Sequence, residues 1–450
     1  MLPFVRMLEY GNKVEVPTVK KFDSIGMGHD RNGGGNWFGA ILASNGNLYG
    51  IGQTKYVSFG ITPTNGAGIE LVRKNVNNFW LLSNGIIVQD NDGSYHFCGV
   101  YANGIFTHSS MNTAPFITNG FINVSSYFAN VGEVVEMVFC GGYDKGPATS
   151  TTSPAYTSKY SCILAALNSN GEIWYMGLSI QGLINNSTSD YYFTSFTKDN
   201  QLTQKVVSLR CTIDMSHNNM YFVGNRPVLY AKLEDGTIVG KGYNIRYGIQ
   251  TPASTNQVIK TWTTVATIGT ADEFDATNEG MMYCSNSQLY RCGNGGGFSF
   301  WNGSSSVYYM GYNVGMFLIG ANDVNRVAGG FNVLTTGIKD GIGINVPTSS
   351  STKIRMNYCG TVIFEPGTTS IYKAHGVYSD YYASPSWQAG AVASFTYEDI
   401  GIRIKDAMYV GGTLGFTTYG LLVVSTEGKV YWRGVYNGTT YQTLTEIQLL

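Results

Sequence analysis

The segment DAMYVGGTLGFTTYGLLVVSTEGKVYWRGVYNG, residues 406–438, contains the unit from which this chain is built. An aliphatic run leads to the dipeptide Glu427-Gly428, a β-rich run follows, and Gly434 stands six positions after Gly428. Glycine adopts a positive φ without steric cost, so such a dipeptide between two β-rich runs is typical of a tight hairpin turn. The segment therefore predicts a strand, a tight turn and a second strand that ends in glycine.

The same pattern recurs from one end of the chain to the other. In each further copy a turn residue is followed six positions later by glycine, and the pairs are Gly46 and Gly52, Gly93 and Gly99, Gly171 and Gly177, Gly236 and Gly242, and Ser287 and Gly293. Another β-rich run that ends in small residues precedes several hairpins, at 22–28, 134–142, 206–212, 262–269 and 406–412. Related hairpins spread over a whole chain predict a repeat protein.

This unit resembles the repeat of the regulator of chromosome condensation family. The resemblance lies in the strand that ends in small residues, the aliphatic strand before the turn and the Gly-x-aliphatic-aromatic-x-x-Gly motif, and it covers most of the chain. GKGYNIRYGI, residues 240–249, also keeps the family's Asn244 and Gly248 after the closing glycine. The tryptophan that precedes the closing glycine in the family is missing, and the insertions are longer. The resemblance implies an all-β fold, a seven-bladed β-propeller, but the family's exchange-factor function is not carried over.

A seventh hairpin has two candidates, within residues 315–332 and 362–378. The first would place its turn at Asp323, and the second at Ser370 with Gly376 as the closing residue. A propeller blade needs about 40–50 residues, and Asp323 follows Ser287 too closely for that, so we favour Ser370. We expect residues 1–20 to form an N-terminal extended arm and residues 21–450 a single seven-bladed β-propeller with long loop insertions. A terminal strand is expected to close the ring by completing a split blade, with the Gly428 hairpin and residues 443–450 beside the first blade.

The composition excludes several classes of function. The formal net charge of the 450 residues is −1 and only 13% are charged, so no basic field exists for nucleic acid or an anionic membrane. The apolar stretches are of strand length, too short for a membrane-spanning helix. Residues 1–17 lack the apolar stretch and cleavage site of a signal peptide, so we expect no secretion by that route.

No pattern of reactive side chains predicts catalysis or a cofactor. The five His show no metal-binding spacing, no Gly-x-Ser-x-Gly motif is present, and the seven Cys contain no Cys-x-x-Cys pair and are interpreted as free buried thiols. ADEFDATNE, residues 271–279, holds four carboxylates that could bind Ca²⁺, but it lacks the glycine-centred spacing of a calcium loop. We interpret it as a solvated loop. A metal site assembled across blades stays an alternative.

Aromatic clusters in polar insertions are the best candidates for a functional surface. Tyrosine and tryptophan among Ser, Gly and Asn form adaptable contact surfaces at low entropic cost. Each cluster could instead pack under its own loop as a satellite core. The candidate partner-binding residues are Tyr191, Tyr192, Phe193, Trp301, Tyr308, Tyr309, Tyr312, Tyr378, Tyr381, Tyr382 and Trp387.

These features predict a non-enzymatic structural or binding protein that acts through protein–protein contacts. A neutral surface rich in Gly, Tyr, Asn and Thr is similar to that of accessory proteins of bacteriophage particles, so the expected partners are virion components of a tail, collar or capsid. Three alternatives stay open. They are a cytoplasmic scaffold that docks a partner protein, an adhesin that binds a host glycan or receptor, and an enzyme with a site in the central channel.

Overall fold

The structure is a computed structural model. It describes residues 17–27, 36–53, 67–82, 85–101, 105–106, 116–117, 120–141, 162–179, 191–213, 227–243, 249, 258–265, 270–277, 280–285, 288–293, 351–357, 360–375, 396–410 and 418–449. These residues form seven antiparallel sheets, numbered 1 to 7 in chain order, and one short 3-10 helix at Ser125–Phe128. No helix among them is long and apolar enough to span a membrane.

The first four sheets follow one another along the chain, each made of consecutive strands. Sheet 1 holds β1 (Val19–Met27), β2 (Asn36–Ala43), β3 (Leu48–Gln53) and β4 (Ala67–Arg73). Sheet 2 holds β5 (Val76–Leu82), β6 (Gly85–Asp90), β7 (Tyr95–Tyr101), β8 (Phe116–Ile117) and β9 (Ile122–Asn123). Sheet 3 holds β10 (Val134–Gly141), β11 (Cys162–Asn168), β12 (Ile173–Ser179) and β13 (Tyr191–Lys198). Sheet 4 holds β14 (Val206–Ile213), β15 (Pro227–Leu233), β16 (Ile238–Tyr243) and β17 (Val258–Thr264).

The last three sheets repeat this order. Sheet 5 holds β18 (Glu273–Thr277), β19 (Gly280–Ser285) and β20 (Gln288–Gly293). Sheet 6 holds β21 (Lys353–Asn357), β22 (Gly360–Phe364), β23 (Ser370–His375) and β24 (Thr396–Asp399). Sheet 7 holds β25 (Ile404–Val410), β26 (Tyr419–Ser425), β27 (Val430–Tyr436) and β28 (Thr439–Ile447).

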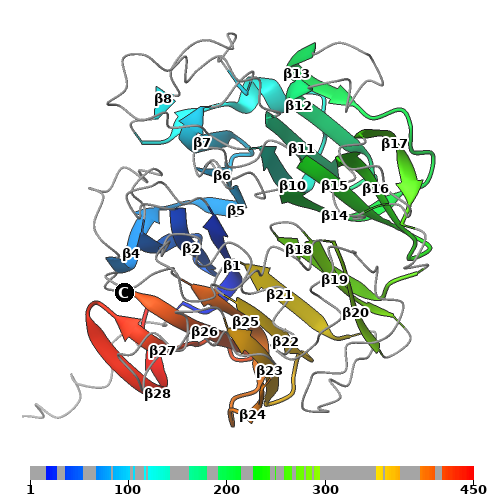
Figure 1. The fold of residues 1–450 in the computed structure, drawn as a ribbon. Coiled ribbons are helices and arrows are strands. Elements are labelled where there is room, and N and C mark those ends of the chain that lie inside the picture. The colour runs from blue at the N-terminus through cyan, green and yellow to red at the C-terminus, as the bar shows by residue number, and fades with distance from the viewer. Residues whose placement is uncertain are drawn as a thin grey trace, which may run out of the picture.

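The sheets are arranged as a closed ring (Figure 1). The first strand of each sheet is the innermost, and it contacts the first strand of the next sheet in the order β1, β5, β10, β14, β18, β21 and β25. Strand β25 in turn contacts β1, which closes the circle. The fold is therefore an all-β propeller. The number of blades stays a prediction, although seven sheets lie within the described residues.

The repeat glycines occupy two special backbone positions. The turn glycines have φ near +80°, as the tight-turn prediction requires, at Gly46 (80°), Gly93 (85°), Gly171 (81°), Gly236 (87°) and Gly428 (79°). The closing glycines also have positive φ, for example 116° at Gly177 and 142° at Gly434. At Gly52, Gly177, Gly242 and Gly434 the pairing with the outermost strand shifts register, so each closing glycine stands at a β-bulge.

At four junctions the same backbone hydrogen bond joins a sheet to the next. The carbonyl of a turn glycine accepts a hydrogen bond from the start of the following sheet, in Val76 N to Gly46 O (2.9 Å), Val206 N to Gly171 O (3.0 Å), Ala271 N to Gly236 O (2.9 Å) and Val19 N to Gly428 O (2.8 Å). The last of these bonds joins sheet 7 to sheet 1. The seam of the ring is thus made like the junctions inside it.

The Gly428 hairpin does lie beside sheet 1, as predicted, but the split-blade prediction is wrong for the described strands. β28 pairs with β27 inside sheet 7, and no described sheet mixes strands from the two ends of the chain. Apolar packing closes the seam instead. Val19, Phe22 and Tyr49 of sheet 1 form one buried cluster with Trp432 and Leu449 from the end of the chain.

Three local predictions differ from the structure. Residues 262–269 were expected to form the β-rich run before the next hairpin, but residues up to Thr264 belong to β17, the outermost strand of sheet 4. Residues 271–279 were expected to be a solvated loop, but β18 occupies Glu273–Thr277 and is the first strand of sheet 5. The favoured hairpin at 362–378 exists as β22 and β23, yet Ser370 begins β23 and the turn before it contains Gly367 at a φ of 87°. Residues 315–332 lie outside the described residues.

The predicted arm and the first strand overlap. β1 begins at Val19, so the last two residues assigned to the arm belong to sheet 1. Residues 1–16 lie outside the described residues, and the division into an arm and one propeller stays a prediction.

Candidate functional site

Most of the predicted partner-binding residues lie outside the described residues. This holds for Trp301, Tyr308, Tyr309 and Tyr312, and for Tyr378, Tyr381, Tyr382 and Trp387. The third cluster is not in a loop, because Tyr191, Tyr192 and Phe193 begin β13. Phe193 is 8% exposed and packs in the apolar core between sheets 3 and 4, so it is removed from the candidate surface. The partner-binding role of the others stays a prediction.

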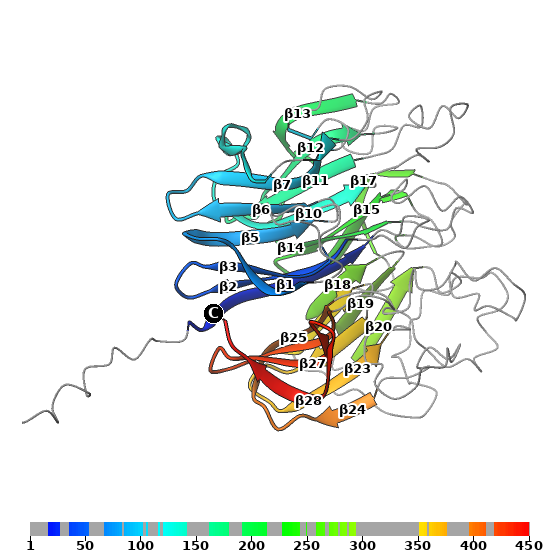
Figure 2. The same cartoon turned by 90° about the vertical axis from the view of Figure 1, so that its left-hand side faces the viewer.

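The ring has two different ends (Figure 2). At one end the tight turns stand beside the starts of the first strands, because Ser44 N donates to Thr18 O and Ser169 N donates to Glu133 O. The first strands run from this turn face to the opposite end. The segments that carry the 301–312 and 378–387 clusters continue the chain from strand ends at that opposite end, after β20 and β23.

Charged side chains link the first strands around the centre of the ring. Arg210 on β14 forms ion pairs with Glu136 on β10 and with Asp275 on β18, where Nε lies 2.8 Å from Oδ1. Arg355 on β21 reaches Asp406 on β25, with Nε 3.0 Å from Oδ1, and also donates to the Phe22 carbonyl on β1. Each arginine therefore joins three neighbouring sheets.

Lys21 completes this central network between sheets 1 and 2. Its ammonium donates to Asn78 Oδ1 at 3.0 Å and to the Phe79 carbonyl, both on β5. Burial lowers the pKa of Lys21 to about 8, against the attraction of Asp23. Burial also opposes the charge on Arg210, but Glu136 and Asp275 outweigh it and raise the pKa of the guanidinium. The network holds its cations in ion pairs and hydrogen bonds that join the sheets.

A buried ion pair lies at the junction of sheets 3 and 4. Lys241 on β16 is 0% exposed, and its Nζ lies 2.9 Å from Oδ2 of Asp199, which directly follows β13. The same oxygen accepts hydrogen bonds from Tyr175 Oη at 2.6 Å and Trp262 Nε1 at 2.8 Å. Burial opposes the Asp199 charge, but Lys241 and the other donors outweigh it and hold its pKa below the usual value. Such a pair joins its two sheets strongly only while both partners are present.

Asp199 stands where two other sheets place an aliphatic side chain, buried at Val265 and partly buried at Ile400. The Asp199 amide donates a hydrogen bond to the carbonyl of Ile173. The corresponding bonds in other sheets are Val265 N to Ile238 O and Ile400 N to Thr369 O. By this bond Asp199, Val265 and Ile400 occupy corresponding positions. The carboxylate is thus an individual feature of the junction between sheets 3 and 4.

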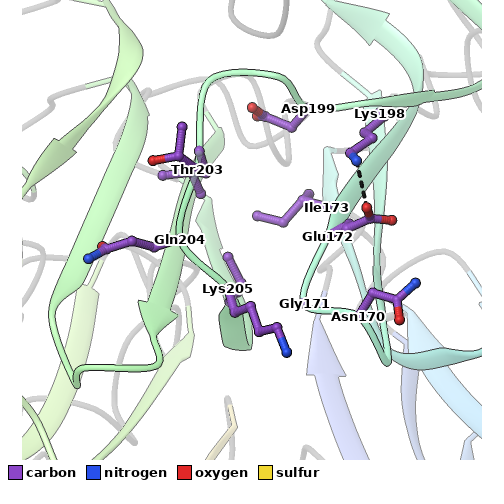
Figure 3. A pocket seen from close by; sticks show the side chains of 11 residues that line it. Asn170, Gly171, Glu172, Ile173, Lys198, Asp199, Thr203, Gln204 and Lys205 are labelled. Atoms are coloured by element: carbon purple, nitrogen blue, oxygen red, sulfur yellow. Dashed lines mark hydrogen bonds and ion pairs between the residues drawn. The ribbon is translucent and has the colours of Figure 1, made fainter.

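A pocket of about 190 Å³ opens on this junction (Figure 3). Its walls are the turn Asn170–Glu172 of sheet 3 and the connector Leu202–Lys205, with Lys198 and Asp199 between them. Lys198 forms an ion pair with Glu172 across one wall. The pocket has no aromatic lining and no free carboxylate at its base, so its chemistry is that of a polar contact site.

A second ion pair lies at the junction of sheets 6 and 7. Arg433 on β27 donates from Nη2 to Glu398 Oε2 at 2.9 Å, and Lys373 Nζ lies 2.9 Å from the same oxygen. Arg433 precedes a closing glycine, as Lys241 does. Burial opposes the Glu398 charge, yet Arg433 and Lys373 outweigh it and lower its pKa to about 2.

These two ion pairs were not predicted from the sequence, although one signal for their cations was available. Lys241 and Arg433 fill a slot that holds Ile51, Cys98 and Met176 in other copies, and a cation in an aliphatic slot was the available signal. Asp275 was assigned to a loop, although it faces Arg210. Among the described residues no group of His, Cys, Asp and Glu could hold a metal ion. The absence of a cofactor stays a prediction.

The ring of sheets defines the chain as a β-propeller, and the comparisons with known proteins agree. A solved structure of yeast RCC1 (Prp20) bound to Kap60 is similar with a TM-score of 0.54 at 12% identity, over 90% of this chain and 84% of that chain. A structure of human WBSCR16 is similar with a TM-score of 0.50 at 10% identity, over 90% of this chain and 94% of that chain. No protein-family model and no curated protein sequence matches. At these identities the likeness shows the fold alone.

Proposed function

We propose that this protein is a non-enzymatic binding protein that acts through protein–protein contacts made at the end of the ring opposite the turn face. The observation that carries this proposal is the structural difference between the two ends of the ring. Tight turns and the inter-sheet hydrogen bonds build a closed ring, and long aromatic-rich insertions continue from strand ends at the other end. A rigid scaffold with decorated loops is an arrangement that proteins use for recognition.

The use of the ionisable groups supports a binding role rather than catalysis. Among the described residues, Arg210, Arg355, Lys241 and Arg433 each form an ion pair that joins two sheets. A catalytic site needs an acid, base or nucleophile poised toward a substrate. The likeness to RCC1, a propeller whose structure was solved bound to Kap60, is consistent with a protein partner.

The finer proposal is an accessory component of a bacteriophage particle, located in the virion and attached through its tail, collar or capsid. It rests on the neutral surface rich in Gly, Tyr, Asn and Thr. A cytoplasmic scaffold and a glycan-binding adhesin are the alternatives. Purified particles distinguish them, because a virion protein stays with the particles through a density gradient and a cytoplasmic scaffold does not.

Aromatic-to-serine variants test the contact surface. One variant replaces Trp301, Tyr308, Tyr309 and Tyr312, and a second replaces Tyr378, Tyr381, Tyr382 and Trp387. We expect both to keep the thermal unfolding midpoint and to lose attachment to the particle. Phe193→Ser is the matched control, because a core residue should lower the midpoint instead. Full attachment of both variants would overturn the proposal.

A further inference from the structure

The turn face carries a ring of corresponding exposed residues. In five sheets the second residue of the first strand has no partner in the register with the second strand. These residues, one in each sheet, are Lys20, Asn77, Val135, Val207 and Lys405. Asp272 and Lys353 follow the buried Ala271 and Thr352 in the corresponding places of sheets 5 and 6. All seven are exposed. These residues form the turn-face rim.

The rim has two chemically different halves. Sheets 6, 7 and 1 contribute Lys353, Lys405 and Lys20, and exposed Arg403 stands beside them. The ammonium groups of Lys405 and Lys20 lie near the next sheet, with Lys405 Nζ at 2.7 Å from Val19 O, whereas Lys353 Nζ lies 3.1 Å from Glu273 of the preceding sheet. The exposed acids of these sheets are Glu365, Asp399, Glu427 and Glu446, and the exposed cations outnumber them when Lys429, the ion-pair partner of Glu446, is included.

The other half is apolar and acidic. Val135 is 46% exposed and Val207 is 51% exposed, on the first strands of two sheets in contact. Around them stand the exposed acids Glu133, Glu234, Asp235 and Asp272, and the exposed cations are Lys198 and Lys205. Two half-exposed valines at positions that are polar in the other five sheets point to a surface that is covered in the working protein.

We propose that the turn face binds a second copy of this chain, face to face about a twofold axis. A twofold axis that lies in the plane of this face places the basic half of each copy over the acidic half of the other. Opposite charges then face each other in both halves of the interface. The aliphatic stems of lysines then cover the valines while their ammonium groups reach the acids beside them. This pairing leaves the opposite end of each ring free for the contacts of the proposed function.

The ionic strength of the solution tests the pairing without any substitution. We expect sedimentation velocity to show a reversible dimer of the full chain whose dissociation constant rises on the order of tenfold when salt is raised from about 0.05 to 0.5 M, because salt screens exposed charges. A chain that sediments as a monomer at low salt and at every concentration would overturn the proposal.

Charge reversal on one half at a time gives the sharper test. One variant carries Lys20→Glu, Lys353→Glu and Lys405→Glu, and the other carries Glu133→Lys, Glu234→Lys and Asp272→Lys. Each variant alone should be a monomer, since like charges then face each other, whereas their mixture should form a heterodimer. Lys260→Glu, on the outermost strand β17 of sheet 4, is the control and should dimerise like the unchanged chain. Dimers of both reversal variants, or no heterodimer from two folded variants, would refute the twofold pairing.

Discussion

The seam between sheets 7 and 1 and the junction between sheets 3 and 4 have the same backbone link but different fillings. Each link runs from the start of a first strand to a turn-glycine carbonyl, 2.8 Å from Val19 N to Gly428 O and 3.0 Å from Val206 N to Gly171 O. At the seam, an apolar cluster around Trp432 fills the space between the two sheets. At the junction of sheets 3 and 4, the buried ion pair of Lys241 and Asp199 lies in the corresponding space.

The difference teaches what each part of the ring requires. The seam is the one junction that no covalent connection between sheets supports, and apolar burial stabilises it without depending on one geometry. A buried ion pair depends on both partners and adds specificity more than net stability. The junction of sheets 3 and 4 can tolerate this arrangement because the chain runs directly from β13 to β14.

Removing the apolar filling of the seam should have the largest effect. Trp432 is 0% exposed, so Trp432→Ala should lower the free energy of unfolding by about 4 kcal/mol through lost burial and a cavity. Denaturant unfolding measures it. Trp432→Phe is the matched control, and because the indole N–H has no hydrogen-bond partner it should cost much less. Equal losses for both variants would mean that the seam does not depend on this packing.

Breaking the ion pair at the other junction should cost somewhat less, and the loss should be partly recoverable. Lys241→Met leaves the Asp199 carboxylate buried and should destabilise the fold by about 3 kcal/mol. The double variant Lys241→Met with Asp199→Leu should restore part of that loss, since it removes the unpaired buried charge but leaves Tyr175 Oη and Trp262 Nε1 without their acceptor. Unfolding of the two single variants and the double variant gives the coupling. A double variant no better than Lys241→Met would contradict this account of the junction.

A side chain at the turn glycine tests the backbone link at both places. Valine at Gly428 would meet Thr18 Cβ at 2.5 Å, and at Gly171 it would meet Lys205 Cβ at 2.8 Å, whereas at Gly236 the nearest atom is 3.4 Å away. All three positions have positive φ, so each Gly→Val should cost about 1–3 kcal/mol, with the smallest loss at Gly236. Thermal unfolding ranks the three. Losses below about 0.5 kcal/mol at Gly171 and Gly236 would show that the strain of these turns is unimportant.

The smallest expected effect is the pH dependence of Lys21, on β1 at the junction of sheets 1 and 2. Its pKa in the folded protein, about 8, is below the ordinary lysine value, so the unfolded chain binds more protons between the two. The contribution of Lys21 to the free energy of unfolding therefore rises with pH above about 8. The stability difference between the unchanged chain and Lys21→Met should change in that direction, on the order of 1 kcal/mol between pH 7 and 10. Parallel pH profiles of the two proteins would contradict the lowered pKa.

The sequence by itself determined the repeat, the tight turns and the propeller class. Gly46, Gly171 and Gly428 could be placed because a positive φ is a local requirement that one residue type meets. The closing glycines were found too, but their β-bulges were not, because a bulge depends on pairing with the outermost strand, which in sheets 1, 3 and 4 follows a long insertion.

Only the tertiary structure decided which side chains meet. Ser24 Oγ donates to the Tyr409 carbonyl across 385 residues of sequence, and Arg210 joins two carboxylates that lie more than 60 residues away on either side. Phe193 and Asp275 were misplaced for the same reason, since an aromatic or acidic residue in a polar stretch has no local mark of the partner that buries it. Backbone conformation is fixed by neighbours in the chain, whereas burial and pairing are fixed by the closure of the ring.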